Sequence, residues 1–447
     1  MQRIKLEELN RWYNSNRRKP LVIWGARQVG KTYLVKDLFA KQYFKDYLYI
    51  DLKKDDDARS FFSSTSDPSK YLRYIEARYG KKLSSDTPLI FDEVQLCSPA
   101  LSSLKYFQQD YPAIPVIATG SLVRLSILHH EKNDNAFLFP VGKINSIHLY
   151  PIGFEEYLLN TNKTLLDDIR LAYMNKKPLE QFEHELAMDC LFEFLSIGGL
   201  PEVVDVFIKE KSYVEAGSVL KEVYSNYLAD MDTYNVSNET ILKTRNVYKN
   251  IFSQLNKENR NFKISQVDGG KSNRDYFNAY QWLELANVVY RSRKLTGKVS
   301  VPIMEEEGGL FRLYLADEGM FSYQSNLPFS DFYARDKRNT LGGIFYENYV
   351  ADEFAMKEIP LYYWTGKNSN EFEFVVDNCG KILPIDVKKG TGRLNSLNAF
   401  RSFNPISPAI KISSANYGYD SRQQILTIPL YEVFLLADDI AQKRPVV

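Results

Sequence analysis

Residues 21–32 read LVIWGARQVGKT. The apolar run Leu21 to Trp24 indicates a buried strand, and the pattern from Tyr33 to Phe39 is helical. Between them lies a match to G-x-x-x-x-G-K-[ST], whose glycines allow turns that point backbone N–H groups at phosphate oxygens. The stretch therefore predicts a phosphate-binding loop formed by Gly25, Ala26, Arg27, Gln28, Val29, Gly30, Lys31 and Thr32.

The last two residues of this loop have separate predicted tasks. Lys31 supplies a point charge for the β- and γ-phosphates, next to the positive end of the following helix dipole. The Thr32 hydroxyl is a Mg²⁺ ligand in loops of this pattern. The sequence therefore predicts ATP and Mg²⁺ as cofactors.

Two further apolar runs end in polar residues that suit the same site. Residues 87–93 predict a strand that delivers Asp92 to hold Mg²⁺ and Glu93 to orient or deprotonate the attacking water. Residues 114–121 predict a neighbouring parallel strand whose Thr119 senses the γ-phosphate. Together with Lys31 as a catalytic cation, these residues predict nucleotide hydrolysis.

Residues 48–51, LYID, suggest one more strand of the same sheet. Its last residue, Asp51, has two interpretations. It either restrains Glu93 or ends the strand in a turn, as aspartate commonly does.

The composition excludes several other classes of protein. The chain has 447 residues, of which 44% are hydrophobic and 25% charged, so it is not disordered, collagenous or fibrous. Its formal charge of +1 shows that the chain as a whole is not a basic nucleic-acid-binding protein. A local basic face is compatible with this charge. Three widely spaced cysteines favour a reducing compartment. With neither an apolar amino-terminal signal nor a membrane-spanning run, we expect a cytoplasmic protein.

Four motifs, GARQVGKT, LIFDEVQ, ATGS and LYPIGFEEY, resemble those of a family of prokaryotic AAA+-type P-loop ATPases. That family carries a carboxy-terminal domain of uncharacterised function. A Gly-Arg pair, a candidate arginine finger, often precedes its fourth motif, whereas this sequence has Gly142-Lys143, and lysine lacks the planar fork. Arg27 and Arg124 are other cationic candidates, with solvated surface as the alternative. The resemblance also leaves a homo-oligomer open.

From Phe154 onward, helical periodicity replaces the glycine-bounded strands and predicts a helical lid. Within it, Gly198-Gly199-Leu200-Pro201 predicts a helix stop followed by a rigid turn, with a hinge as the alternative.

Residues 262–294 predict helix, turn, helix and strand, which is the order of a winged-helix module. The second helix is expected from Arg274 to Val289. Lys271, Asn273 and Arg274 at the start of its second helix are candidates for DNA contact, and protein contact is the alternative. Tyr276 and Tyr280 fit packing better than base stacking.

Beyond Asn339 the sequence predicts a helix that carries Glu347 and continues to Met356, followed by three strands. One strand, over 371–376, carries Glu371 and Glu373 on the same face, because side chains alternate along a strand. Another, over 382–387, leads into Asp386-Val387-Lys388, where the first and third residues share a face.

Carboxylates on adjacent strands with a lysine two residues on resemble the PD-(D/E)XK nuclease core, in which acids hold Mg²⁺ and the lysine helps to activate water. The resemblance implies a nuclease-like site of Glu347, Glu373, Asp386 and Lys388. This part also resembles the carboxy-terminal domain of the ATPase family, where aspartate is usual at position 373 and glutamate at 386. Each exchange keeps the charge but moves the carboxylate by about one methylene.

The predicted fold class is α/β, in three domains. Residues 1–155 form a P-loop ATPase domain with a parallel sheet and helices on both faces, 156–335 a helical lid with a winged-helix-like region, and 336–447 a nuclease-like domain. We expect an ATPase whose nucleotide cycle controls the carboxy-terminal domain, with DNA or a protein as partner and no membrane. The alternatives are a nucleotide-gated regulatory protein with a catalytically silent carboxy-terminal domain, and a toxin-like or defence nuclease restrained by the ATPase.

Overall fold

The computed structural model describes residues 1–121, 140, 142–231, 237–305, 309–327, 343–366, 370–388, 395–405 and 408–446. The chain forms two compact units. The amino-terminal unit consists of residues 2–151 with 285–287, and the carboxy-terminal unit of residue 1 with 152–284 and 288–447. Arg124, one of the cationic candidates, lies outside the described residues.

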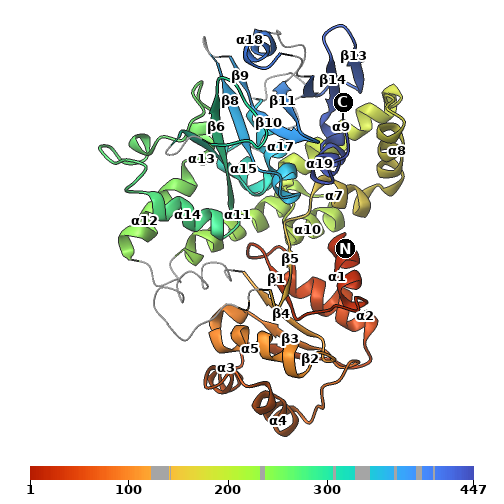
Figure 1. Ribbon diagram of the computed structural model, residues 1–447, viewed down its shortest axis with the longest axis vertical. Helices are drawn as coiled ribbons and strands as arrows, with labels where there is room; N and C mark the ends of the chain where they lie inside the picture. Colours follow the sequence, from red (N-terminus) through yellow and green to blue (C-terminus); the bar gives the residue numbers. More distant parts are fainter. Residues whose placement is uncertain are drawn as a thin grey trace. The chain divides into compact units, whose positions relative to one another are not determined.

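The amino-terminal unit is built on a parallel sheet of five strands (Figure 1). The strand order is β2-β3-β4-β1-β5, and each neighbouring pair runs parallel. The carboxyl ends of these strands therefore meet at one edge of the sheet. The strands are β1 (Leu21–Trp24), β2 (Leu48–Asp51), β3 (Leu89–Asp92), β4 (Val116–Gly120) and β5 (Asn145–His148).

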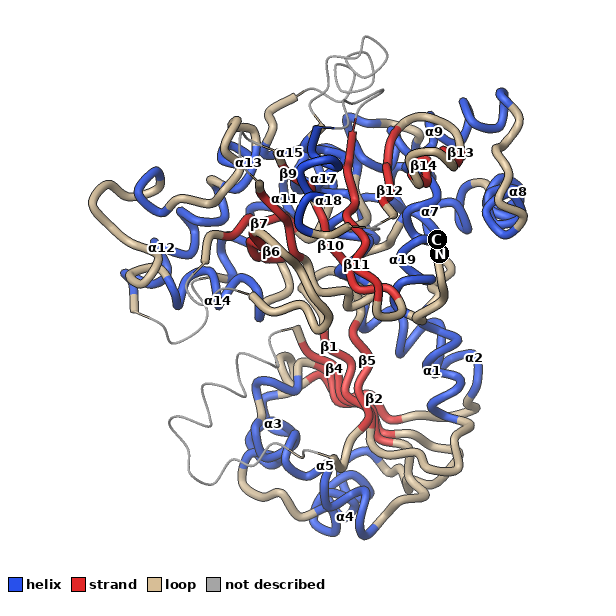
Figure 2. The backbone as a smooth tube through the Cα atoms, turned by 45° about the horizontal axis from the view of Figure 1, so that its top comes forward, coloured by secondary structure: helices blue, strands red, loops and turns tan. Residues whose placement is uncertain are grey.

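Helices cover both faces of this sheet, as Figure 2 shows. On one face, the apolar cluster that includes Phe62, Tyr71 and Phe107 packs against the strands. On the other, Trp12 and Tyr13 pack against Phe39. The helices are α1 (Lys5–Tyr13), the π-type helix η1 (Tyr33–Ala40), α2 (Lys41–Tyr43), α3 (Asp56–Ser63), α4 (Pro68–Tyr79), η2 (Val94–Leu96) and α5 (Ser98–Asp110).

The carboxy-terminal unit begins with helices, as the periodicity after Phe154 predicts. Gly198 (φ +76°) ends one of these helices, and Pro201 begins the next. A Cβ on Gly199 would lie 1.9 Å from the carbonyl oxygen of Ile152, so this turn is closely packed and fits the rigid-turn interpretation. The helices are α7 (Phe154–Thr161), α8 (Lys163–Met174), α9 (Gln181–Ile197), α10 (Pro201–Glu210), α11 (Tyr213–Asp230), α12 (Asn238–Lys249) and α13 (Ile251–Leu255).

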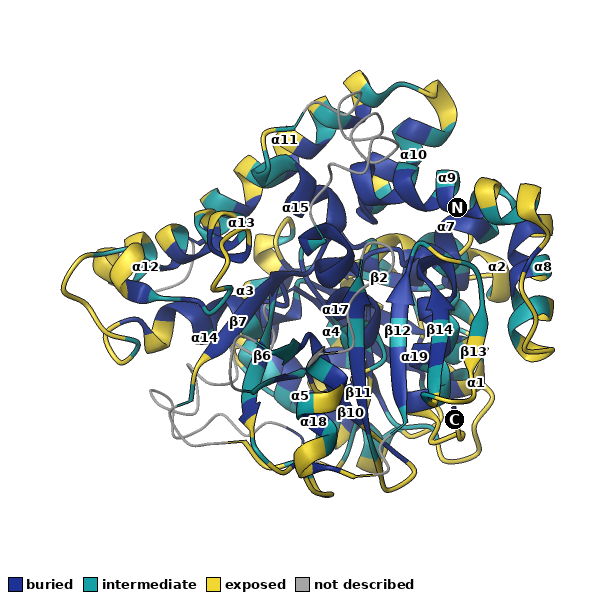
Figure 3. Cartoon of the chain, turned by 90° about the horizontal axis from the view of Figure 1, so that it is seen from above, coloured by how far each residue is buried: buried dark blue, intermediate teal, exposed yellow. Residues whose placement is uncertain are grey.

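Two mixed sheets follow, with strand orders β7-β6-β8-β9 and β10-β11-β12-β14-β13. Figure 3 shows β12 and β14 as largely buried strands. The strands are β6 (Val289–Thr296), β7 (Phe311–Leu315), β8 (Tyr362–Thr365), β9 (Glu371–Phe372), β10 (Phe374–Asn378), β11 (Lys381–Lys388), β12 (Ala409–Ser413), β13 (Gly418–Asp420) and β14 (Ile425–Pro429). The accompanying helices are η3 (Ile264–Gln266), α14 (Phe277–Leu285), α15 (Glu318–Gln324), α17 (Ile344–Met356), α18 (Asn395–Phe403), η4 (Leu430–Glu432) and α19 (Val433–Ala441).

Two predicted elements differ from the structure. The helix expected from Arg274 to Val289 is shorter, because Asp275 accepts the backbone N–H of Ser272 in a turn and Asn287 has a left-handed φ of +57°. The strand expected over 371–376 is broken at Glu373, since β9 pairs with β8 and β10 pairs with β11.

The predicted winged-helix region is only partly recognisable. Its first helix is the single 3₁₀ turn η3, whereas α14 and an antiparallel β6–β7 pair follow in the expected order. Strand β6 also pairs with β8, so this region shares a sheet with the residues after 336. The winged-helix assignment and the domain boundaries near 155 and 335 stay predictions. Among the described helices, no helix combines the length and apolar character required to cross a bilayer.

Candidate functional sites

The phosphate loop connects the carboxyl end of β1 to η1. Gly25 has a φ of +153°, and a Cβ there would lie 1.9 Å from the Leu149 carbonyl oxygen, so the loop requires glycine at this position. Gln28 and Gly30 also have positive φ, at +62° and +87°. These turns give the loop the irregular backbone that its sequence pattern predicts.

Lys31 is folded against its own loop. Its ammonium donates hydrogen bonds to the carbonyl oxygens of Gly25 at 3.1 Å and Ala26 at 2.6 Å. Burial lowers the pKa of Lys31 to about 8, against the opposing influence of Glu93 and Asp92. The half-buried Arg27 lowers the same pKa further, which places its positive charge near Lys31. A second cation within the loop adds to the attraction for an anion.

Asp92 is the centre of this site. Its carboxylate accepts hydrogen bonds from Thr32 at 2.8 Å, from Tyr49 at 2.6 Å and from the hydroxyl of Thr119. The sheet explains this arrangement, because β3 lies between β2 and β4 and all three end at the same edge. The structure therefore brings together Thr32, Asp92 and Thr119, which lie far apart in the sequence.

Glu93 follows Asp92 in a left-handed conformation, with a φ of +55°. Its backbone N–H donates to the Asp92 carboxylate at 3.0 Å, and its own carboxylate accepts a hydrogen bond from the Gln95 side chain. A residue other than glycine in this conformation is uncommon and is often found at functional sites. The two acids are therefore neighbours in the chain, but Asp92 contacts hydroxyl groups whereas Glu93 contacts Gln95.

Asp51 ends its strand in a turn, the second of its two interpretations. Its carboxylate accepts the backbone N–H groups of Lys53 at 2.9 Å and Lys54 at 3.2 Å. The β2 side chain that reaches the site is Tyr49, which the sequence analysis did not single out. The alternation of LYID, with Leu48 and Ile50 buried, was the available signal, because it places Tyr49 and Asp51 on one face.

Arg3 is a second residue that sequence reasoning missed. It is 5% exposed and donates to the carbonyl oxygens of Val29 at 2.7 Å and Tyr150 at 2.9 Å. The guanidinium therefore joins the phosphate loop to the segment after β5. No local pattern in the sequence indicates this contact, because Arg3 lies well before the loop and before the matched motifs.

Lys143 lies at the opposite edge of the sheet from the phosphate loop. It precedes β5, which is parallel to β1, while the loop follows the carboxyl end of β1. The contact between the Lys19 ammonium and the Gly142 carbonyl, at 2.7 Å, belongs to that same opposite edge. Lys143 therefore lies away from the phosphate loop of its own chain.

The donor groups around Asp92 fit Mg²⁺. Thr32 and Asp92 present a hydroxyl and a carboxylate at one point, and hard oxygen ligands are what this ion requires. Mg²⁺ in nucleotide sites is usually held by one or two protein oxygens together with phosphates and water, so a larger cluster of acids is not needed. Thr32 and Asp92 are therefore the residues that would hold the ion.

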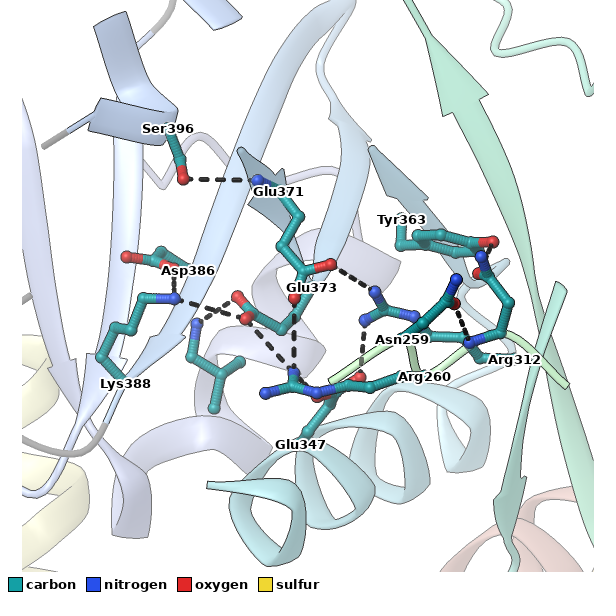
Figure 4. A network of polar contacts seen from close by, with 12 residues as sticks. Asn259, Arg260, Arg312, Glu347, Tyr363, Glu371, Glu373, Asp386, Lys388 and Ser396 are labelled. Carbon is teal, nitrogen blue, oxygen red and sulfur yellow. Dashed lines mark hydrogen bonds and ion pairs between the residues drawn. The ribbon is translucent and has the colours of Figure 1, made fainter. Parts of the chain in front are cut away.

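The carboxy-terminal unit contains a separate cluster of acids, drawn in Figure 4. Lys388 contacts Asp386 at 3.0 Å and Glu373 at 3.4 Å. Glu347 projects from α17 into the same cluster and is 1% exposed. The structure thus brings together Glu347, Glu373, Asp386 and Lys388, the four residues of the predicted nuclease-like site.

Two arginines that sequence reasoning missed join this cluster. Arg312 contacts Glu347 at 2.8 Å and Glu371 at 2.6 Å. Arg260 forms an ion pair with Glu347 and lies 3.7 Å from Glu371 and 3.5 Å from Glu373. The signal for Arg312 was its place in FRLYL, an otherwise apolar strand where it shares a face with Tyr314.

The pKa shifts in the cluster reflect this pairing. Burial raises the pKa of Glu347, but Arg260 and Arg312 lower it more, so the net pKa is below its ordinary value. Burial raises the pKa of Glu373 to about 7, against the influence of Lys388. Burial lowers the pKa of Lys388, but Glu373 and Asp386 raise it more, so Lys388 stays charged.

This cluster does not fit a bound divalent metal in the state described. The positions next to the carboxylate oxygens are taken by Arg260, Arg312 and Lys388. Within the described residues, no group of three or more histidine, cysteine, aspartate or glutamate side chains is arranged to hold a metal ion. The nuclease-like site stays a prediction, and in the structure its acids are paired with cations.

The residues considered for DNA contact lie in the turn before α14. Lys271 and Arg274 are exposed, while Tyr276 and Tyr280 are buried and therefore pack inside the unit. The adjacent cations of β6 are paired: Arg291 contacts Glu284 at 3.0 Å, and Arg293 contacts Glu305. DNA contact through Lys271, Asn273 and Arg274 stays a prediction.

Three protein families match successive parts of the chain. Residues 17–158 match an AAA domain, residues 188–331 a domain of unknown function (DUF8612), and residues 342–432 another domain of unknown function (DUF4143). A comparison with curated proteins found no match.

Among solved structures, a Walker-type ATPase of Pyrococcus abyssi is 15% identical with a TM-score of 0.44, over 72% of this chain and 95% of that chain. The ORC2 protein of Aeropyrum pernix in its ADPNP–ADP complexes is 11% identical with a TM-score of 0.38, over 75% of this chain and 94% of that chain. The same protein in its ADP form is 13% identical with a TM-score of 0.28, over 76% of this chain and 96% of that chain. The match that covers the phosphate loop is the similarity of residues 17–158 to an AAA domain.

Proposed function

We propose that the amino-terminal unit binds ATP with Mg²⁺ and hydrolyses it. The observation that carries this proposal is the contact set of Asp92, which joins Thr32 of the phosphate loop to Thr119 of β4 beside Glu93. The AAA domain match over residues 17–158 supports it independently.

In this proposal the loop residues bind the phosphates and Glu93 acts on the attacking water. Lys31 exchanges its contacts with Gly25 and Ala26 for phosphate oxygens, and its charge stabilises the transferring phosphoryl group. Glu93 exchanges its contact with Gln95 for the attacking water, which it orients or deprotonates. Thr119 links the γ-phosphate position to Asp92. Mg²⁺ held by Thr32 and Asp92 would neutralise charge that develops on the phosphates.

Steady-state ATP hydrolysis tests this proposal. Lys31→Ala should abolish nucleotide binding and turnover, whereas Glu93→Gln should bind ATP and hardly hydrolyse it. Lys41→Ala is the matched control, because its ammonium pairs with Asp37 at the surface beyond η1. Normal turnover by Glu93→Gln would overturn the assignment of the base, and turnover that persists in Lys31→Ala would overturn the assignment of the site.

The same assay tests the partner. Single- and double-stranded DNA are added to the parent protein and to Lys31→Ala. Stimulation of Lys31-dependent turnover supports a DNA partner, whereas turnover that DNA leaves unchanged favours a protein partner for the regulatory cycle.

A second part of the proposal concerns the carboxy-terminal cluster. Its acids are paired with Arg260, Arg312 and Lys388, which favours a catalytically silent state. We propose that this nuclease-like region is catalytically silent in the state described and that the nucleotide cycle regulates binding through it. Plasmid DNA incubated with Mg²⁺ or Mn²⁺ should remain intact with both the parent and Lys388→Ala. Nicking by the parent alone would show a working nuclease.

A further inference from the structure

A cavity of about 310 Å³ in the carboxy-terminal unit is lined by residues of α14, β6 and β7. Aromatic rings form part of its lining: Phe277 and Tyr280 come from α14, and Phe311 comes from β7. Tyr280 and Phe311 are each 5% exposed, and their ring centroids are 5.3 Å apart. The volume is at the lower end of the range for ligand pockets, so the cavity suits one small planar group.

Phe277 differs from the other two rings because it is open to solvent. It is the first residue of α14 and is 46% exposed, although its side chain is large and apolar. Its ring stands edge-on to Tyr280, with centroids 5.5 Å apart and an interplanar angle of 77°. The buried Tyr280 therefore supports an aromatic ring that borders the cavity and remains accessible. A ring in this position can stack on a planar ligand.

Two arginines of β6 bring positive charge to the same cavity. Arg291 and Arg293 are two residues apart in a strand, so their side chains share a face. The Arg291 guanidinium lies 5.3 Å from the ring centroid of Tyr280 and 5.7 Å from that of Phe311. Glu284 contacts it at 3.0 Å. Arg291 is thus held within the aromatic lining, which leaves Arg293 as the arginine nearer to solvent.

Arg293 already binds an oxyanion at the cavity. Its guanidinium forms an ion pair with the Glu305 carboxylate, and the two side chains are 36% and 47% exposed. An ion pair this exposed contributes little to stability, so another oxyanion can take the place of Glu305. A phosphate group suits this position, because its oxygens match the fork of guanidinium donors. Asn273 also lines the cavity, and an asparagine amide can donate to and accept from the edge of a base.

We propose that this cavity binds one unpaired nucleotide of a single-stranded nucleic acid. The base stacks on Phe277, and the adjoining phosphate replaces Glu305 at Arg293. In a duplex the faces of each base are covered by neighbouring base pairs, so an unpaired base is required to present a face to Phe277. The inference deepens the proposed function by naming the class of partner, and it rests on that function only for the regulatory consequence of the contact.

Fluorescence anisotropy without ATP tests this inference on the full chain. The labelled probes are oligothymidylate, oligouridylate and a DNA duplex of equal length, and at least one single strand should bind more tightly than the duplex. Phe277→Leu should weaken single-strand binding at least about fivefold, because the stacking ring is lost, whereas Phe277→Trp should retain it. Phe182→Leu alters an exposed phenylalanine outside the cavity and is the matched control, which should stay within about twofold of the parent.

The two charged residues give a second readout. Arg293→Gln should weaken binding and should reduce the slope of log affinity against log salt concentration by about one. Glu305→Gln should strengthen single-strand binding by about threefold, because the carboxylate that competes with the phosphate is removed. If Phe277→Leu does not fold, these two variants decide the matter. Opposite shifts in affinity support the inference, and shifts in the same direction overturn it.

Several results would overturn the inference. These are duplex binding as tight as that of both single strands, an effect of Phe277→Leu no larger than that of Phe182→Leu, and absence of single-strand binding by Glu305→Gln. Polyglutamate that displaces the strand as well as unlabelled strand does would also overturn it, since the site would then respond to charge alone. Failure of the proposed function is distinguishable, because ATP turnover that persists in Lys31→Ala overturns the ATPase site and leaves Phe277-dependent strand binding as support for this inference.

Discussion

The two acidic sites of this chain differ in what surrounds their carboxylates. Asp92 is contacted by hydroxyl groups of Thr32, Tyr49 and Thr119 and by one backbone N–H. The carboxy-terminal acids are contacted by guanidinium and ammonium groups in addition to neutral donors such as the Tyr314 hydroxyl. Neutral donors orient a carboxylate and leave its charge available to a metal ion, whereas arginine neutralises it. The carboxylate of Asp92 is therefore available to a cation, whereas the carboxy-terminal acids already have cationic partners.

The largest effect should follow from removing the charge at Asp92. Asp92→Asn should lower ATP turnover by about 10³-fold, because the amide can no longer ligate Mg²⁺ as a carboxylate does. Glu373→Gln should leave turnover within about twofold. The comparison fails if the two variants lose ATP turnover to a similar extent.

A smaller but clear effect on stability is expected at Arg312. Arg312→Met removes the buried guanidinium that pairs with Glu347 and Glu371, which should destabilise the carboxy-terminal unit by roughly 3–5 kcal/mol. The midpoint of its thermal unfolding should then fall by about 10 °C. Lys54→Ala, which removes an exposed ion pair with Asp51, is the control and should shift unfolding by less than about 1 °C. Equal shifts would show that burial does not distinguish the two pairs.

Glu432 is a buried acid of a third kind, because within the described residues its carboxylate has no hydrogen-bond partner. Burial raises its pKa to about 8, from an ordinary value of about 4.3. As the pH rises between these values, the unfolded chain loses a proton that the folded chain keeps, so the folded state loses stability.

Glu432→Gln removes this ionisation. It should match the parent near pH 4 and be more stable by roughly 2–4 kcal/mol near pH 9, with the difference growing up to about pH 8. Thermal unfolding midpoints across this pH range measure the effect. A difference that is constant with pH would mean that Glu432 does not titrate as its burial implies.

The smallest effect is expected at Tyr49. Tyr49→Phe removes one hydrogen bond to Asp92 and keeps the ring, so ATP turnover should fall by about fivefold, as for the loss of about 1 kcal/mol. Tyr363→Phe is the control, because the Tyr363 hydroxyl donates to Asn261 in the other unit. A Tyr49→Phe chain with full activity would show that the Thr32 and Thr119 contacts are enough to orient Asp92.

The sequence predicts the phosphate loop better than the residues that support it. Gly25, Lys31 and Asp92 belong to local patterns of spacing, and the parallel sheet lies where these patterns indicate. Arg3 and Arg260 act through contacts that join distant parts of the chain, at Val29 and at Glu347, so no local pattern contains them. The carboxy-terminal acids were identified individually, but the arginines that pair with them come from other segments of the chain.

Two glycines are packed directly against a backbone carbonyl oxygen, and this limits which substitutions the chain tolerates. Gly25 is approached by the Leu149 carbonyl and Gly199 by the Ile152 carbonyl, each within its own unit and each 1.9 Å from where a Cβ would lie. Both contacts are made by backbone atoms, so the identity of the side chains at 149 and 152 matters less than the absence of one at 25 and 199. In a library of single substitutions, the two glycines should reject even alanine, while Leu149 and Ile152 accept apolar replacements of similar volume.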